Sequence, residues 1–175
     1  MSIEDQKEYP LHRNWTLWYG KWNAPKKVMS FQTIADMWKL LNNIKAPTEL
    51  PPQNDYHIFA TGIAPEFEDE NNKHGGSLVL EVSAHDANTY WLHTLLALVG
   101  NNFTYGDDIT GLMINCKPKF ARIQLWVRTT EHHERLKQTS EEWKKMLEVH
   151  YRQQVKFSSH HDIYILQQYA PKFVF

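Results

Sequence analysis

The stretch Ser77-Leu-Val-Leu-Glu-Val-Ser83 decides the fold class, because its apolar residues alternate along the chain. Successive side chains of a strand point to opposite faces, so three of them are expected on one face: Leu78, Leu80 and Val82. The next apolar segment has a helical period, and we expect a helix from about Asp86, as its N-cap, to Val99, ended by Gly100. A half-buried strand that leads into an apolar helix indicates a mixed domain.

Other segments extend this pattern in both directions. A helix is expected near residues 33–42, and a third one after the capping box Thr139-x-x-Glu142. The third helix repeats an apolar stripe of Trp143, Met146, Leu147 and Tyr151. Strands are expected at residues 14–19, 55–60, 112–117 and 122–129. Short strands interrupted by three helices predict an α+β fold, with the helices on one face of an antiparallel sheet.

The composition is that of one ordinary domain of 175 residues, with 42% hydrophobic and 22% charged residues. We expect a flexible tail at residues 1–8 and a single domain at residues 9–175. The only cysteine, Cys116, cannot form an internal disulfide, which favours a reducing compartment. The longest apolar run, residues 95–99, is too short to span a bilayer, so no membrane association is expected.

The charge balance excludes a protein that coats nucleic acid unspecifically, because 19 basic residues face 20 acidic ones. Any anion must therefore be held by a local patch. The chain also has seven Trp, eight Tyr and eight Phe, and large aromatic rings serve either as core or as stacking surfaces.

The strand Arg122-Ile-Gln-Leu-Trp-Val-Arg128 offers such a patch, because alternation separates its apolar residues from its polar ones and Trp126. The polar face carries Arg122, Gln124, Trp126 and Arg128, and the preceding segment adds Asn115, Lys117 and Lys119. A tryptophan among cations is expected to do no core work and suits a flat, phosphorylated ligand. The alternative is a solvated strand face with one amphipathic tryptophan.

Two further segments leave alternatives open. In the acidic loop at residues 65–76, Phe67 lies between Glu66 and Glu68, and a carboxylate there can accept hydrogen bonds from the N1/N2 edge of guanine; a plain acidic surface loop is the alternative. The helix at residues 86–99 is apolar over a wide arc, so it is either fully buried or exposes a patch that invites a partner helix.

Motifs for chemistry are missing from the sequence. Ten histidines include the pairs 132–133 and 160–161, but neither HExxH nor a zinc-type Cys/His spacing occurs. GxGxxG, P-loop and GxSxG motifs do not occur either. We therefore expect no metal, no cofactor and no enzymatic activity.

Taken together, the motifs resemble those of the eukaryotic translation initiation factor 4E family over nearly the whole chain from Tyr9 onward. The resemblance rests on motifs that follow one another in the family's order: Tyr9-Pro-Leu-x-x-x-Trp15-x-Leu-Trp18, Trp38, Asp55-Tyr56, Gly62-Ile-x-Pro65, Phe67-Glu-Asp-Glu70, Gly75-Gly76, Trp91-Leu-x-Thr-Leu-Leu96, Gly100, Asp107-Asp-x-x-Gly111, Trp126 and Lys172-Phe-Val-Phe175. The fold it implies is a curved antiparallel sheet with three helices on its convex face.

The resemblance implies binding of the 7-methylguanosine cap of mRNA in the concave face. Residues matching the base contacts are Trp22 and Phe67 for stacking, Glu68 for the guanine edge and Trp126 for the methyl group. Residues matching the phosphate contacts are Lys117 and Arg122, with Lys119 as a helper. Departures from the family are Phe67 in place of a tryptophan, Ser77-Leu78 in place of an Arg-Trp pair, a shortened loop before Trp22, and a divergent segment after Asp162 without a lysine for the third phosphate.

Members of the family also bind partners that carry a Tyr-x4-Leu-hydrophobic helix, through a patch on their convex side. Residues matching this patch are Tyr9, Pro10, Leu11, Ile34, Trp38, Leu92 and Leu96, whereas His93 replaces a usual acidic residue. The resemblance thus implies a monomeric adaptor, cytoplasmic and also nuclear, that binds capped mRNA and a scaffold initiation factor or binding protein. Alternatives are a repressor that competes for cap, an interaction module with a weakened cap pocket, and a cap-cleaving hydrolase.

Overall fold

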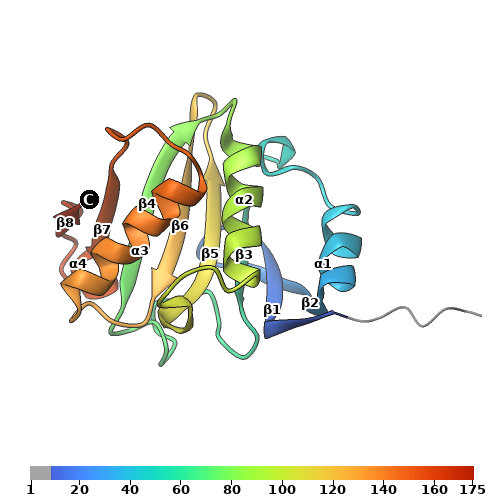
Figure 1. Ribbon diagram of the computed structural model, residues 1–175, viewed down its shortest axis with the longest axis horizontal. Coiled ribbons are helices and arrows are strands. Elements are labelled where there is room, and N and C mark those ends of the chain that lie inside the picture. The colour runs from blue at the N-terminus through green and yellow to red at the C-terminus, as the bar shows by residue number, and fades with distance from the viewer. Residues whose placement is uncertain (1–8) are drawn as a thin grey trace, which may run out of the picture.

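One antiparallel sheet of eight strands forms the centre of the computed structural model, which describes residues 9–175 (Figure 1). The tail predicted at residues 1–8 lies outside these described residues. In chain order the strands are β1 (Pro10–Gly20), β2 (Lys26–Thr33), β3 (Asp55–Ala60), β4 (Gly76–Ser83), β5 (Ile109–Cys116), β6 (Phe120–Val127), β7 (Val155–Ser159) and β8 (Phe173–Val174). Their order in the sheet is β2-β1-β3-β5-β6-β4-β7-β8.

Three longer helices cover one face of the curved sheet, as Figure 1 shows, so the expected α+β architecture is confirmed. The helices are α1 (Ile34–Leu41), α2 (Ala87–Val99), α3 (His133–Met146) and the short α4 (His160–Tyr164). Two 3-10 turns, η1 (Pro47–Glu49) and η2 (Gly106–Asp108), lie in the connections. Among residues 9–175, no helix has the length and apolar character to cross a lipid bilayer.

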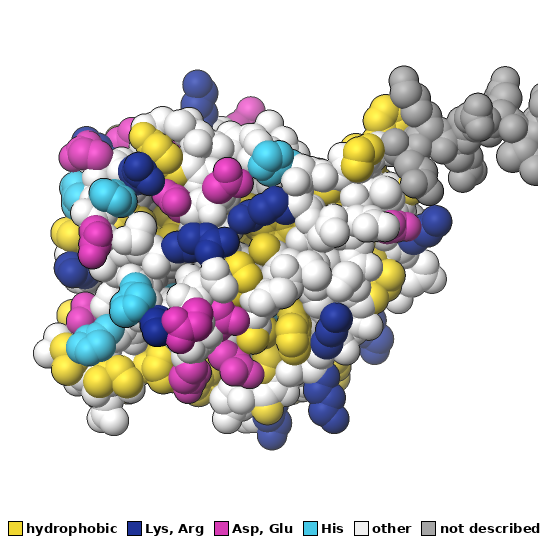
Figure 2. All heavy atoms as spheres, turned by 90° about the horizontal axis from the view of Figure 1, so that it is seen from below, with side chains coloured by type: hydrophobic (Ala, Val, Ile, Leu, Met, Phe, Trp, Pro, Cys, Tyr) yellow, Lys and Arg dark blue, Asp and Glu magenta, His cyan; other side chains and the backbone are white. Residues whose placement is uncertain are grey.

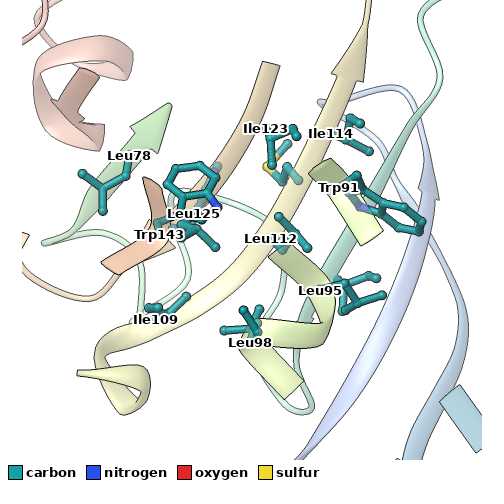
Figure 3. Packing of buried hydrophobic residues seen from close by; sticks show 14 of the residues in the cluster. Leu78, Trp91, Leu95, Leu98, Ile109, Leu112, Ile114, Ile123, Leu125 and Trp143 are labelled. Atoms are coloured by element: carbon teal, nitrogen blue, oxygen red, sulfur yellow. The ribbon is translucent and has the colours of Figure 1, made fainter. Parts of the chain in front are cut away.

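The main core lies between the sheet and helices α2 and α3 (Figure 3). The predicted strand face of Leu78, Leu80 and Val82 is buried there, as is the α2 stripe of Trp91, Leu95 and Leu98. Burying one such side chain stabilises the fold by roughly 1.5–3 kcal/mol. On the neighbouring stripe Val99 is buried but Leu92 and Leu96 stay half exposed, so α2 is not covered all round.

The predicted start of the third helix is wrong. Helix α3 begins at His133, six residues before the proposed cap, and Thr139 is buried inside it. The Glu142 carboxylate accepts instead from the backbone N–H of Thr104, at 3.0 Å, and so joins α3 to the loop after α2. Tyr151 is 74% exposed, outside the helix and away from its stripe. The first turn of α3 is strongly polar, which hides it from a search for apolar periodicity.

The ends of α2 are at the predicted residues but use different chemistry. Asp86 is the N-cap residue, but its side chain accepts no hydrogen bond from the first turn of the helix. Its backbone N–H donates to the Ser83 hydroxyl at 3.2 Å. Gly100 has a φ of −76°, whereas Asn101 has the left-handed backbone with a φ of 54°. Asparagine tolerates this conformation better than most residues, so the left-handed turn after the helix lies at Asn101 and not at the predicted glycine.

Four elements escaped the sequence analysis: β2, β7, β8 and α4. Strand β2 buries only Phe31 and Thr33, so it lacks an alternating pattern. Helix α4 is a single turn, whose N-cap Ser159 accepts a hydrogen bond of 3.0 Å from the backbone N–H of Asp162. This turn brings its last residue, Tyr164, to a cavity on the face of the sheet opposite α1–α3.

Candidate functional site

The candidate site lies on the face of the sheet that the three long helices leave uncovered. In β6, Ile123 and Leu125 point into the core, while the polar residues alternate with them as predicted. Trp126 points to the uncovered face but is only 3% exposed, and its ring meets the edge of Phe59 at 5.3 Å. The expectation that Trp126 does no core work is therefore wrong: its ring packs on Phe59 and also lines a cavity.

This cavity has a volume of about 300 Å³ and brings together all four residues that matched the base contacts. They come from separate parts of the chain: the β1–β2 loop, the acidic loop and strand β6. The cavity is lined by Trp22, Asn23, Pro65, Glu66, Phe67, Glu68, Met113, Trp126 and Tyr164. Aromatic walls with a carboxylate at the rim suit a flat ligand that has N–H donors on one edge.

The loop that carries Phe67 and Glu68 is held from inside by two side chains that the sequence analysis did not single out. The fully buried amide of Asn72 donates to the carbonyls of Ala64 and Glu66, at 2.9 and 2.8 Å. Asp69 accepts from the backbone N–H of Ala64 at 2.9 Å. Partial burial of Asp69 opposes its ionisation, but the N–H groups of Ala64 and Asn71 that donate to its carboxylate hold its pKa below the usual range.

The exit from this loop requires glycine. A Cβ on Gly75 would lie 1.8 Å from the Val127 carbonyl oxygen, so no larger residue fits at this crossing.

On the end of the molecule drawn in Figure 2, acidic side chains gather beside Lys and Arg side chains. One of the cations near the loop is Arg128, which donates to the Asn71 side chain and, at 3.2 Å, to the Asp107 carbonyl. Arg128 thus anchors the loop and does not face the cavity.

Tyr164 is an aromatic wall of the cavity that the sequence analysis missed. Its ring is stacked on Phe67, with centroids 4.4 Å and planes 9° apart, and on Trp22, with centroids 6.0 Å and planes 21° apart. Burial, together with the negative charge of Glu68, raises the pKa of Tyr164. The sequence signal for it was Ser159-x-x-Asp162, a capped turn that places Tyr164 one turn after His160.

His160 forms the support behind these rings. It is 1% exposed, with its ring 4.0 Å from that of Trp126 and 6.0 Å from that of Tyr164. Burial lowers the pKa of His160 to about 4, so the imidazole is neutral at physiological pH. A neutral ring here adds no positive charge beside the two carboxylates that line the cavity, Glu66 and Glu68.

The predicted phosphate-binding cations lie further along the same face. Arg122 is four residues before Trp126 in β6, which places it about 13 Å away along the strand. Its Nε lies 3.2 Å from a Glu81 carboxylate oxygen, and both side chains are about half exposed, so the pair is weak. Lys117 and Lys119 lie exposed in the β5–β6 turn and line neither this cavity nor the groove beside it.

A second, wider groove of about 690 Å³ begins on the other side of Tyr164. It contains Arg122 and two cations that the sequence analysis did not consider, Arg152 and Lys156. Its lining is Ser77, Val79, Glu81, Arg122, Gln124, Arg152, Gln153, Gln154, Lys156, Ser158, Ile163, Tyr164, Tyr169 and Pro171. Tyr164 is the residue that borders both the cavity and the groove.

Asn115 and Cys116, the last two residues of β5, are partly buried and do not line the cavity. Asn115 donates to the Asp55 carboxylate at 2.7 Å and is thereby engaged below the surface. Burial raises the pKa of Asp55, against the effect of this bond. Cys116 is a free, half-buried thiol whose pKa is raised to about 11 by burial and by Asp55.

The residues matching the partner patch lie at the opposite, helical face. Tyr9, Ile34 and Trp38 are 57%, 42% and 40% exposed, and the Ile34 backbone N–H donates to the Tyr9 carbonyl at 3.0 Å. Pro10 is exposed, while Leu11 and the α2 residues Leu92 and Leu96 are half buried. Tyr9, Ile34 and Trp38 are thus among the large apolar side chains that the described part of the chain exposes.

Residues 10–170 match the family model described as Eukaryotic initiation factor 4E. Eukaryotic translation initiation factor 4E-1A of Danio rerio is 33% identical over 93% of this chain and 81% of its own length. Eukaryotic translation initiation factor 4E of Homo sapiens is 33% identical over 89% of this chain and 77% of its own length.

Solved structures give the same result. C. elegans eIF4E-3, in complex with the 4E-binding protein Mextli and cap analog, superposes with a TM-score of 0.88 at 30% identity, covering 97% of this chain and 100% of that one. Ascaris suum eIF4E-3 with m7G cap gives a TM-score of 0.85 at 30% identity, covering 95% and 97%.

Proposed function

The chain belongs to the eukaryotic initiation factor 4E family, and from this premise we propose that it binds the 7-methylguanosine cap of mRNA. One observation carries the proposal: Trp22, Phe67, Glu68 and Trp126, which are far apart in sequence, line a single cavity of about 300 Å³. The cap ligands in the structures of C. elegans and Ascaris suum eIF4E-3 support the same ligand class.

Base recognition rests on charge as well as shape. Methylation at N7 makes guanine cationic, so its stacking on Trp22 and Phe67 gains cation–π attraction. Each stacking ring contributes about 1–3 kcal/mol. Trp126 contacts the methyl group. Unmethylated guanine stacks without the positive charge and binds more weakly.

The edge of the base is read by the residues after Pro65. The Glu68 carboxylate accepts hydrogen bonds from N1–H and N2–H, and the backbone N–H of Phe67 donates to O6. The positive charge on the base acidifies N1–H, which strengthens its bond to the carboxylate. Among residues 9–175 the structure records no ion pair to Glu68, so its carboxylate is not engaged by a lysine or arginine.

The phosphates of the cap extend along the uncovered sheet face toward Arg122, Lys117 and Lys119. These cations add affinity without reading the base. A surface pair such as Arg122–Glu81 is weak enough to be exchanged for a phosphate contact. Because Lys117 and Lys119 are exposed, their contribution falls with rising salt concentration.

The exposed apolar patch on the convex side binds a protein partner, a scaffold initiation factor or a binding protein with a helical Tyr-x4-Leu-hydrophobic segment. The complex of C. elegans eIF4E-3 with the 4E-binding protein Mextli supports this class of partner. The protein then acts in the cytoplasm as a non-enzymatic adaptor in translation initiation, with mRNA bound on one face of the sheet and a partner on the other.

The experiment that tests the cap site is isothermal titration of 7-methyl-GTP into the Trp22→Ala and Glu68→Gln variants. We expect Trp22→Ala to weaken binding roughly 5- to 150-fold, as loss of one stacking ring implies. Glu68→Gln keeps the shape of the side chain but removes its charge, and is expected to reduce the preference for the methylated base. Glu131→Gln, an exposed glutamate before α3, is the matched control. Unchanged affinity in both site variants would contradict the proposed site.

A further inference from the structure

Tyr164 holds the position that a stacked base requires. Its ring lies parallel to Phe67 within 9° at 4.4 Å, and it also stacks on Trp22 at 6.0 Å. The negative charge of Glu68 acts on the phenol, which places Tyr164 near the carboxylate that reads the guanine edge. One phenol therefore contacts or faces three of the groups assigned to base recognition.

The spacing leaves no room for a second flat ring in this stack. Stacked rings need about 3.5 Å on each side, so an inserted base requires roughly 7 Å between the rings that enclose it. The Phe67–Tyr164 and Trp22–Tyr164 centroid distances are 4.4 and 6.0 Å. A base that stacks on Phe67 and reaches Glu68 must therefore take the place of the phenol.

We propose that Tyr164 is an internal competitor of the cap, which covers the Phe67 ring and turns away when the methylated base binds. This inference rests on the proposed function and concerns how strongly the same site binds the cap. The residue comes from the segment after β7, in the part of the chain that departs from the family pattern.

The groove beside the cavity gives the phenol a place to go. Tyr164 borders both spaces, and the groove, at about 690 Å³, is more than twice the cavity's 300 Å³. Helix α4 is held at its first turn by the Ser159 cap and by buried His160, whereas Tyr164 is its last residue. The side chains that follow, Ile165 and Leu166, are 58% and 49% exposed, while their backbone N–H groups donate to the His161 carbonyl, so we expect the Tyr164 side chain to turn and the backbone to stay.

A competitor within the chain lowers affinity by the fraction of molecules in which the site is open. An aromatic pair such as Tyr164–Phe67 corresponds to roughly a 2- to 12-fold shift in this population. Removal of the phenol is therefore expected to tighten binding by the same factor. Because every ligand must displace the same ring, 7-methyl-GTP and GTP gain equally and their affinity ratio does not change.

The test compares the parent with Tyr164→Ala and Tyr164→Ser by titration of 7-methyl-GTP and GTP, with circular dichroism to establish that each variant is folded. Tyr151→Ala, a tyrosine that is 74% exposed outside both spaces, is the matched control and should bind like the parent. We expect both Tyr164 variants to bind both ligands roughly 2- to 12-fold more tightly at a constant ratio.

A second measurement uses the parent protein alone. If the ring must leave first, the observed association rate in stopped-flow fluorescence reaches a plateau as 7-methyl-GTP concentration rises, and Tyr164→Ala raises or abolishes that plateau. Unchanged or weaker binding by the Tyr164 variants would overturn the inference and leave the proposed function intact, since Tyr164 would then be inert or a stacking surface. Failure of parent and variants alike to bind 7-methyl-GTP would overturn both.

Discussion

The side-chain amide of Asn72 donates a hydrogen bond of 2.8 Å to the carbonyl of Glu66, the residue before Phe67. The same amide donates to Ala64, and Asn72 itself is fully buried. The loop that carries Phe67 and Glu68 is thus fixed by the protein before any ligand arrives. A site held in advance loses less entropy on binding, which supports affinity without a direct contact.

Replacement of Asn72 by alanine is the first prediction. It leaves two carbonyls in a partly buried region without their donor, and each such loss costs about 1–3 kcal/mol. We expect Asn72→Ala to lower the free energy of unfolding by about 2 kcal/mol or more in urea denaturation, and to weaken 7-methyl-GTP binding. The exposed Asn14→Ala on β1 serves as control. Parent-like stability and affinity would show that the loop does not depend on this amide.

A change at Phe67 tests the smaller of the two stacking rings. Phe67→Trp offers a larger and more electron-rich face to the cationic base, so its affinity for 7-methyl-GTP is expected to rise roughly 2- to 5-fold. Phe67→Ala is expected to bind more weakly than the parent. Both are measured by titration calorimetry, and equal affinity of Phe67→Ala and the parent would exclude Phe67 as a stacking surface.

Acid sensitivity follows from two buried histidines. Burial lowers the pKa of His57 and the pKa of His160, each to about 4. A backbone hydrogen bond partly opposes each shift, from Gly20 for His57 and from Gly76 for His160. In the unfolded chain both titrate near 6.5. Between these values the unfolded state binds more protons, so stability is lost as pH falls from about 6.5 toward 4.

The expected loss at pH 5 is about 2 kcal/mol for each buried histidine. Urea denaturation at pH 7 and pH 5 measures it, and His57→Gln should remove about half of the difference. His150→Gln, which changes an exposed histidine, should leave the difference as in the parent. Equal stability of the parent at both pH values would mean that the two imidazoles are protonated inside the fold.

The convex surface is tested separately from the cap site. Trp38 is 40% exposed on α1, on the helical side of the sheet. Trp38→Ala is therefore expected to bind 7-methyl-GTP like the parent but to lose a peptide with a Tyr-x4-Leu-hydrophobic helix. Fluorescence anisotropy with such a labelled peptide gives the affinity. Peptide binding that survives the substitution would remove Trp38 from the partner surface.

The sequence predicted best what depends on local pattern. Strand β3 was predicted at its observed residues. Strand β4 and helix α2 were predicted within one residue, because the apolar period of these two segments is regular. Helix α3 was misplaced because its first turns are polar, and β2 was missed because most of it is exposed. These elements are stabilised by neighbours, such as Thr104 for Glu142, which no local pattern reveals.

The residues of the candidate site also fall into a group that the sequence indicated and a group that it did not. Motif order pointed to Trp22, Phe67, Glu68 and Trp126, and the fold assembles them around one cavity; their role in binding stays a prediction. The residues that support or cover the cavity were not found from sequence. Asn72 looked like one more polar loop residue, and the capped turn Ser159-x-x-Asp162 that positions Tyr164 was overlooked because it is only one turn long. Only the tertiary structure shows that one amide holds the loop and that one phenol covers Phe67.

Parallel titrations of the parent protein with 7-methyl-GTP and with GTP, followed by tryptophan fluorescence, measure whether the pocket is selective for the methylated cap. Because Trp22 is 56% exposed and Trp126 lines the cavity, a bound base should quench their emission. We expect saturable quenching by 7-methyl-GTP and an affinity for GTP that is at least tenfold weaker, the factor that about 1.4 kcal/mol of cation–π and charge-assisted bonding provides. Equal affinity for the two nucleotides, or no binding of either, would contradict this selectivity.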